Sequence, residues 1–195
     1  MTTLLRVTTT IVLGLLIAQL SNLDATAQEQ ASRYTDSKYD FSITVAQSWK
    51  DGRLQDYAVP GVARVAYARP DGASIVVFMQ EPGKDYAPRF LVDESAKSME
   101  KNLAAKVVEK EVREVGKKKA MWLVVEGPGT GGAIDGKGAV VTSQHWIAIP
   151  REKDIVVALL TSPTKDFEEN QKTFIEAINA FQVGGKQTAA QSESK

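Results

Sequence analysis

The sequence predicts an α+β protein in which an antiparallel β-sheet is flanked by helices, as a three-layer α/β/α sandwich. Three observations lead to this prediction: β-rich apolar runs are joined by short turns, central runs are apolar on both faces, and two amphipathic helical patterns alternate with them. Short turns join antiparallel neighbours. Strands that are buried on both faces need a covering layer on each side, which two helices can supply.

The first half of the chain contains the first predicted strands. In residues 39–45 apolar side chains alternate with polar ones, which indicates a half-buried strand. Two further β-rich runs, 62–68 and 73–79, are joined by a Pro-Asp-Gly turn in which proline presets φ and glycine accepts a positive φ. The second run is apolar on both faces, so we expect it at the centre of the sheet. A short strand is also predicted at 55–59.

Two helices and four more strands complete the predicted fold. Residues 88–105 carry a single apolar stripe at helical spacing, formed by Val92, Ala96, Met99 and Leu103. Strands are predicted at 107–115, 120–126, 139–149 and 155–161. A last helix is expected after a cap at Ser162 or Thr164 and ends before Gly184. One polar residue interrupts its stripe, which consists of Phe167, Gln171, Phe174, Ile178 and Phe181.

The N-terminal sequence predicts export of the protein from the cytoplasm. Arg6 precedes an apolar core at 11–18, and Ala25-Thr26-Ala27 is a small-x-small cleavage site, so 1–27 is predicted as a signal peptide. Cleavage would leave a mature chain that starts at Gln28 and is periplasmic or secreted, without a transmembrane span; the alternative is an uncleaved anchor. We expect a polar linker at 28–37, one folded domain at 38–183 and a disordered tail at 184–195.

Composition excludes several classes of site. The chain has 195 residues, no cysteine, one histidine and a formal net charge of zero. Without cysteine there is no disulfide, thiolate metal site or thiol nucleophile. One histidine cannot supply the imidazoles of a histidine-rich metal site within one chain. Neutrality argues against nucleic acid as a partner. No cofactor and no metal are therefore expected.

The stretch Phe-Ser-Ile-Thr-Val-Ala-Gln-Ser-Trp at 41–49 resembles the opening signature of the PsbP-like family. That family includes photosystem proteins, nuclear Ran-binding relatives and bacterial secreted domains of unknown function. The order of predicted elements is similar as well, with a glycine turn near Gly116 and a terminal helix that ends at Phe181. Ala46 departs from the pattern, which usually has proline there. The resemblance implies an antiparallel sheet flanked by helices and a role as adaptor or assembly factor, without a reaction.

The glycine-rich segment 127–138 is the most distinctive motif. Within it, 131–138 fits G-x-x-x-x-G-K, but Gly138 stands where a P-loop has the serine or threonine that binds magnesium. A β-rich run follows, whereas a P-loop must open a helix. Nucleotide binding is therefore not expected, and the segment is either a mobile hairpin loop or a loop that closes over a ligand or docks a partner. The candidate contacts are Gly127, Gly129, Gly131, Gly132, Asp135 and Lys137.

His145 and a run of three lysines are two further candidate sites. His145 shares a strand face with Val141, Ile147 and Ile149, which favours a partly buried core histidine with its hydrogen bonds satisfied over a catalytic residue or metal ligand. The lysines at the expected hairpin tip, Lys117, Lys118 and Lys119, are either a charged turn or a contact for anionic lipid headgroups or an acidic partner. The three tryptophans are expected in the core.

These observations predict a non-catalytic accessory domain that acts outside the cytoplasm and binds a protein or assists an assembly. Its partner is expected to be another extracytoplasmic or membrane-associated protein. The alternative is a small-molecule or lipid carrier with a pocket between sheet and helix. A second alternative is a hydrolase that uses His145, which would need a hydroxyl or carboxylate beside the imidazole.

Overall fold

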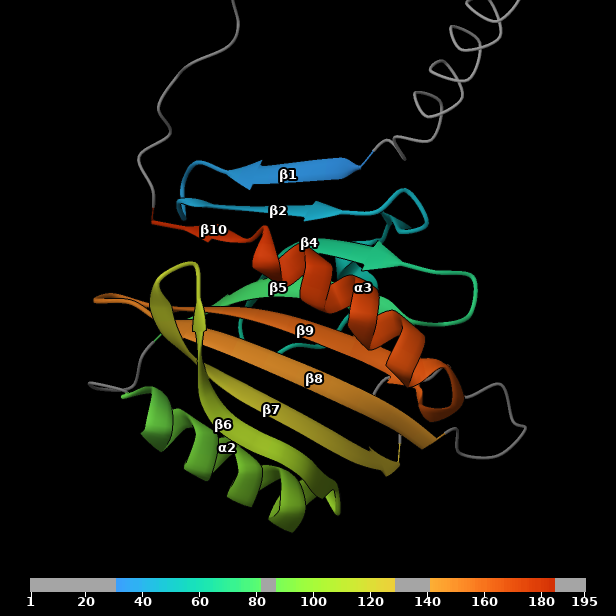
Figure 1. Ribbon diagram of the computed structural model, residues 1–195, viewed down its shortest axis with the longest axis vertical. Helices are drawn as coiled ribbons and strands as arrows, with labels where there is room; N and C mark the ends of the chain where they lie inside the picture. Colours follow the sequence, from blue (N-terminus) through green and yellow to red (C-terminus); the bar gives the residue numbers. More distant parts are fainter. Residues whose placement is uncertain (1–30, 82–86, 129–140, 185–195) are drawn as a thin grey trace, which may run out of the picture. The chain divides into compact units, whose positions relative to one another are not determined.

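Strands β5 (Ser74–Gln80) and β9 (Ile155–Pro163) pair along their length within a large antiparallel sheet. The computed structural model describes residues 31–81, 87–128 and 141–184, all of which belong to one compact unit. Within these residues the large sheet has the order β3-β4-β5-β9-β8-β7-β6 (Figure 1). Its other strands are β3 (Lys50–Asp51), β4 (Val62–Ala68), β6 (Lys106–Val115), β7 (Lys118–Pro128) and β8 (Val141–Pro150).

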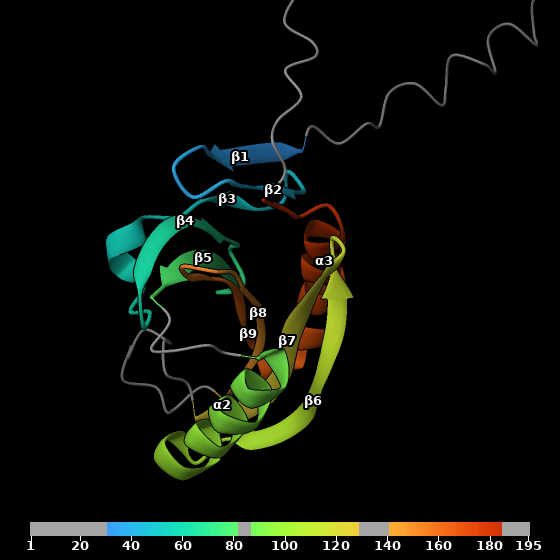
Figure 2. The same ribbon diagram turned by 90° about the vertical axis from the view of Figure 1, so that its left-hand side faces the viewer.

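The two helices cover opposite faces of this sheet (Figure 2). Helix α2 (Pro88–Leu103) packs on β6, β7 and β8, whereas α3 (Phe167–Asn179) contacts β9 and β2. Alternate residues of β9 divide between two hydrophobic clusters. Ile155, Val157 and Leu159 join the α2 side, and Val156, Ala158 and Leu160 join the α3 side. The predicted α+β architecture, with one helix on each face, is confirmed.

A second, smaller sheet lies beside the first and contains β1 (Ser32–Asp36), β2 (Phe41–Val45) and β10 (Gln182–Val183) in the order β1-β2-β10. The prediction of a linker at 28–37 is therefore wrong for 32–36, because β1 pairs with β2 along its whole length. The predicted signal peptide at 1–27 and the predicted tail beyond Gly184 lie outside the described residues.

An ion pair between the buried Asp36 and the partly buried Arg64 attaches the polar β1 to the fold, in addition to its pairing with β2. Asp36 is buried and accepts hydrogen bonds from Arg64 Nε of β4 at 2.7 Å and from the Tyr34 hydroxyl at 3.1 Å. The backbone amides of Lys38 and Tyr39 donate to the same carboxylate, each at 3.1 Å. Burial by itself opposes ionisation of Asp36, but these donors outweigh it and hold its pKa below the usual value. The charge pair thus joins the small sheet to the large one.

The predicted strand at 55–59 is wrong. Residues Leu54–Asp56 form a short 3-10 helix, η1, in which the backbone amide of Asp56 donates to the carbonyl of Arg53 at 3.0 Å. The Asp56 carboxylate also accepts a hydrogen bond from Arg53 Nε at 2.9 Å. These local contacts close a turn. The apolar residues that follow it in the sequence suggest a strand instead and give no sign of this turn.

The predicted cap of the last helix is wrong as well. A second 3-10 turn, η2 (Thr164–Asp166), precedes α3, and the N-cap residue Asp166 makes no side-chain capping bond. Ser162 belongs to β9, and the hydroxyl of Thr164 donates to the carbonyl of Val141 at 3.1 Å. Both hydroxyls therefore bind elsewhere instead of capping the helix.

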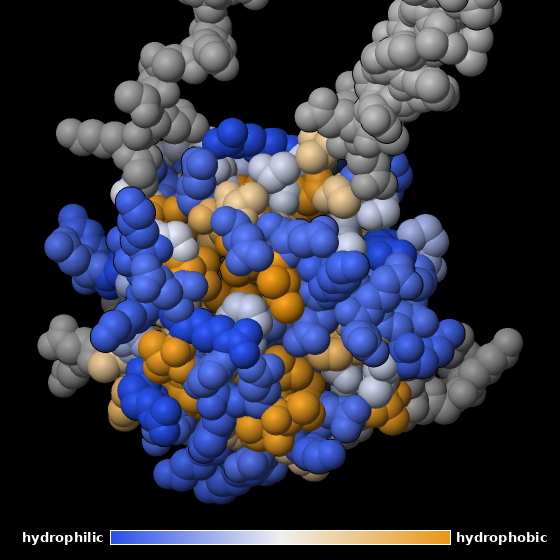
Figure 3. All heavy atoms as spheres, viewed as in Figure 1, coloured by the Kyte–Doolittle hydropathy of each residue, from blue (hydrophilic) through white to orange (hydrophobic). Residues whose placement is uncertain are grey.

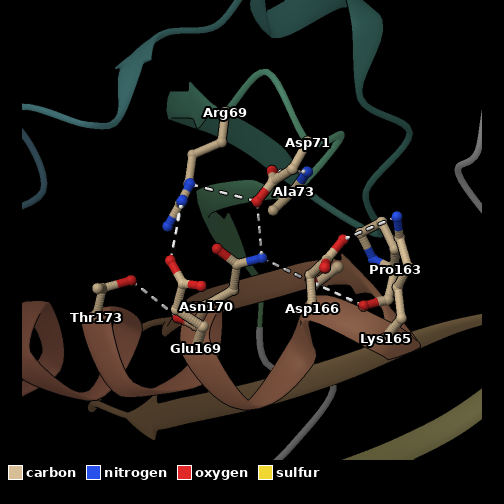
Figure 4. Close-up of polar contacts among 10 residues, drawn as sticks. Arg69, Asp71, Ala73, Pro163, Lys165, Asp166, Glu169, Asn170 and Thr173 are labelled. Atoms are coloured by element: carbon tan, nitrogen blue, oxygen red, sulfur yellow. Dashed lines mark hydrogen bonds and ion pairs between the residues drawn. The ribbon is translucent and has the colours of Figure 1, made fainter.

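A polar network attaches the first turn of α3 to the β4–β5 turn (Figure 4). Asn170 is fully buried, and its Nδ2 donates to Asp71 Oδ2 at 3.2 Å and to Ser162 Oγ at 3.0 Å. Arg69 extends the network, with its guanidinium 3.2 Å from Glu169 and 3.4 Å from Asp71. The turn predicted from Pro-Asp-Gly is thus also an anchoring point for α3.

We expect Asn170→Ala to lower the free energy of unfolding by about 1–3 kcal/mol, because it removes buried hydrogen bonds and leaves their partners unsatisfied. Asn179→Ala, at an exposed position of the same helix, should change it by less than about 0.5 kcal/mol. Urea denaturation followed by circular dichroism measures both. Equal effects of the two variants would contradict an anchoring role for Asn170.

Candidate functional site

A groove lies between α2 and the large sheet, on the face opposite α3. Its volume is about 490 Å³. Buried apolar side chains of β7, β8 and β9 line its sheet side: Met121, Ala148, Ile155 and Val157. Small and medium side chains at these positions leave space beneath the helix.

The helix side of the groove is amphipathic. Glu94, Ser95 and Ser98 line it, and their spacing places them along one flank of α2. The remaining residues that line the groove are mostly apolar: Pro60, Gln80, Phe90, Leu91, Met99 and Trp146. The side chain of Phe90 is 51% exposed. Among the lining residues that the structure describes, Glu94 is the only charged one.

Trp146 gives the groove an aromatic wall of defined orientation. Its Nε1 donates to Gln144 Oε1 at 3.0 Å, and its ring meets Phe78 edge-on, with centroids 6.1 Å apart and planes at 89°. Trp49 and Trp122 are buried, as expected, whereas Trp146 is only partly buried. Trp146 is therefore both a core contact and a groove residue.

His145 lies on the opposite face of β8, between the sheet and α3. It is fully buried, with ring centroids 4.2 Å from Trp122 and 5.3 Å from Phe174. Its Nδ1 is 3.3 Å from the side-chain amide nitrogen of Gln171, and its Nε2 has no hydrogen-bond partner within the described part of the chain. Burial, assisted by the charge of Arg113, lowers the pKa of His145 to about 3.

This environment agrees with a core histidine but corrects two details of the prediction. The imidazole is completely buried instead of partly buried, and only one ring nitrogen has a partner. Gln171, the residue that interrupts the apolar stripe of α3, is that partner. Neither ring nitrogen meets a hydroxyl or a carboxylate among the described residues, so the geometry does not support the hydrolase alternative.

The three lysines do not form one cluster at a hairpin tip. The β6–β7 turn consists of Gly116 and Lys117, which have φ of 53° and 68°, as a two-residue turn with positive φ at both positions requires. Lys118 and Lys119 are the first residues of β7 and therefore point to opposite faces of the strand. Lys117 and Lys119 are exposed, and Lys118 is partly buried. Contact with anionic groups stays a prediction.

The structure describes one of the six candidate contacts in the glycine-rich segment. Gly127 lies in β7 and pairs with Thr142 of β8. A Cβ atom there would come within 3.2 Å of Ala105, so glycine allows the strand to pass close to the segment after α2. Gly129, Gly131, Gly132, Asp135 and Lys137 lie outside the described residues, and their role as a partner or ligand loop stays a prediction.

Exposed apolar surface on the α3 side is not continuous. Figure 3 shows hydrophobic residues in separate groups, divided by hydrophilic side chains.

In residues 31–81, 87–128 and 141–184, no group of three or more potential metal ligands comes together. No helix in those same ranges is long and apolar enough to cross a bilayer.

The sequence predicts a pocket between sheet and helix only as the carrier alternative, and it does not indicate which helix or which residues form it. From the sequence, α2 is a packing stripe and Trp146 is a core residue. The available signal was Ser95 and Ser98 beside the apolar stripe of α2, together with Phe90, which lies outside that stripe. That signal does not reveal which strands face the serines, and the pairing of β7, β8 and β9 decides it.

The buried imidazole predicts how stability depends on pH. An unfolded chain binds a proton at His145 near pH 6.5, but the folded chain does not until about pH 3. The contribution of His145 to the free energy of unfolding is therefore complete above about pH 6.5 and decreases by about 1.4 kcal/mol per pH unit below it.

Urea denaturation between pH 8 and 5 measures this slope. Carboxylates contribute the same background to the wild type and to His145→Leu, so the difference between the two slopes isolates the imidazole. Parallel pH profiles for the two proteins would show that His145 is not held neutral by burial.

No family model and no curated protein matches the chain. Solved structures that are similar to it over most of its length include the following three. PsbP (CyanoP) from Synechocystis sp. PCC 6803 is 14% identical with a TM-score of 0.55, over 82% of this chain and 95% of that one. The Ran-binding protein Mog1p from Saccharomyces cerevisiae is 15% identical with a TM-score of 0.53, over 80% and 96%.

The third structure is PA94, a protein of unknown function from Pseudomonas aeruginosa. It is 16% identical with a TM-score of 0.51, and the match covers 81% of this chain and 99% of that one. At these identities the likeness shows the fold and leaves function open. The fold expected from the stretch at 41–49 is therefore confirmed: this chain has the PsbP-like fold.

Proposed function

We propose that this protein is a non-catalytic accessory domain that acts outside the cytoplasm and binds another protein. The fold that it shares with the Ran-binding protein Mog1p, over 80% of the chain, carries the proposal. The buried, neutral His145 supports it, since this imidazole has no reactive partner within reach in the described part of the chain. The exposed Phe90 beside the groove offers an apolar contact of the kind that anchors protein interfaces.

The proposed location depends on the N-terminal segment. When the full chain is expressed in a bacterium, we expect the product outside the cytoplasm to begin at Gln28, because Ala25-Thr26-Ala27 provides the cleavage site. Intact-mass measurement of the periplasmic and culture fractions tests this. Ala27→Leu should block cleavage at that site. A full-length product that stays in the cytoplasm would contradict the proposed location.

Binding to a protein is tested by capture from extracytoplasmic and membrane extracts of the source organism. We expect the tagged chain to retain one partner in both low and high salt, in a fixed ratio, because apolar contacts resist screening. Phe90→Ser should weaken capture. Leu54→Ser is the matched control, since Leu54 is also exposed but does not line the groove. Retention that is lost in high salt, or equal in both variants, would contradict an apolar interface at Phe90.

The carrier remains a second candidate because a specific observation favours it. The groove lies between sheet and helix, as that alternative requires, and its volume of about 490 Å³ falls within the ~300–1,000 Å³ of small-molecule sites. Its lining combines apolar residues with a few polar groups on one side.

A further inference from the structure

We infer that the α2 groove binds an uncharged or cationic amphiphile with an apolar ring system, and that it discriminates against anions. This inference deepens the carrier candidate and names the class of ligand for that site. It rests on the lining residues, their charges and the arrangement of polar groups along one wall.

The apolar part of the ligand is assigned by the sheet side of the groove. Met121, Ala148, Ile155 and Val157 present no polar side-chain atom, so a polar group placed against them would lose its hydrogen bonds to water without replacement. Trp146 at one wall favours a flat ring, because aromatic faces and edges pack well against one another. The body of the ligand is therefore apolar, and a ring fits better than a hydrogen-bonding chain.

The polar part of the ligand is assigned by α2. Ser95 and Ser98 provide hydroxyl groups on the flank that borders the groove, and Glu94 lies next to them. A hydroxyl, amine or ammonium group of the ligand can donate to these oxygens while the ring faces the sheet. The Ser98 hydroxyl already accepts a hydrogen bond from Asn102 Nδ2 at 3.1 Å, which leaves its own proton available.

The charge that the groove accepts on a ligand follows from Glu94. It is the only charged residue among the groove residues that the structure describes, and none of these residues is a lysine or an arginine. Lys97 lies 4.0 Å from Glu94, and both side chains are exposed, at 76% and 54%, so solvent and salt weaken both charges. Arg89, another cation of α2, pairs with Asp93 at 3.2 Å. Among the described groove residues, an anionic ligand would therefore lose its hydration and meet a carboxylate.

Three naphthalene probes separate the charge classes: neutral N-phenyl-1-naphthylamine, anionic 1-anilinonaphthalene-8-sulfonate and cationic 1-naphthylmethylammonium. The first two share one skeleton and differ by a sulfonate. We expect the neutral probe to bind with one-to-one stoichiometry and the anionic probe to bind about two- to fivefold more weakly. Energy transfer from tryptophan should decrease in Trp146→Phe, because Trp146 is the tryptophan that lines the groove.

Glu94→Gln and Glu100→Gln, two variants on α2, isolate the effect of the Glu94 charge on binding. Glu94→Gln should lower the affinity for the cationic probe by about two- to fivefold and raise the affinity for the anionic probe by a similar factor. The affinity for the neutral probe should not change. Glu100→Gln removes the same charge from an exposed position of α2 that does not line the groove, and it should change none of the three affinities. Ser98→Phe, also at an exposed position, should block the neutral probe without unfolding the chain.

The outcomes separate the ligand class from the site itself. Equal affinities for neutral and anionic probes, or equal effects of Glu94→Gln and Glu100→Gln, would overturn the charge assignment even if Ser98→Phe still blocks binding. Absence of probe binding, or binding that Ser98→Phe leaves intact, would overturn the groove as a ligand site and the carrier candidate with it. A dimer seen by analytical ultracentrifugation and dissociated by Ser98→Phe would assign the groove to a second copy of the chain instead.

Discussion

Burial of apolar side chains on both faces of β5 and β9 is the constraint on which the rest of the structure depends. A strand of this kind is stable only if each face is removed from water, so the large sheet needs a helix on either side. The alternation along β9 divides the hydrophobic interior into two clusters, one under α2 and one under α3. The two sides then take different roles, since the α3 side is closed by the small sheet and the α2 side keeps a groove.

Polar contacts decide how the α3 side is closed. Asp36 and Arg64 join the small sheet to β4, and Asn170 joins α3 to the β4–β5 turn. Each contact satisfies a buried polar group, so losing one partner costs more than the hydrogen bond itself contributes. His145 belongs to the same side, where Trp122, Phe174 and Gln171 surround it. Its burial explains why a lone histidine in this chain is a packing residue with an unusual pKa.

The α2 side carries the candidate site because its helix covers only part of the sheet. Helix α2 lies on β6, β7 and β8, and the space toward Pro60 is lined by apolar sheet residues and by one amphipathic flank of the helix. An apolar recess whose described lining residues include one carboxylate suits an amphiphile or an apolar anchor of a partner. A shared fold with CyanoP and Mog1p is compatible with either use, since function depends on the site that each protein builds on the fold.

The sequence alone determined the fold class, the positions of most strands along the chain and the apolar face of each helix. The reason is that the periodicity of apolar residues follows directly from strand and helix geometry. It also assigned His145 to the core. Tertiary structure decided what periodicity cannot encode: the polar strand β1 is held by its pairing with β2 and by the contact of Asp36 with Arg64, 28 positions away in the sequence. The residues that line the groove were equally hidden, because they come from α2, β5, β7, β8 and β9 and only folding brings them together.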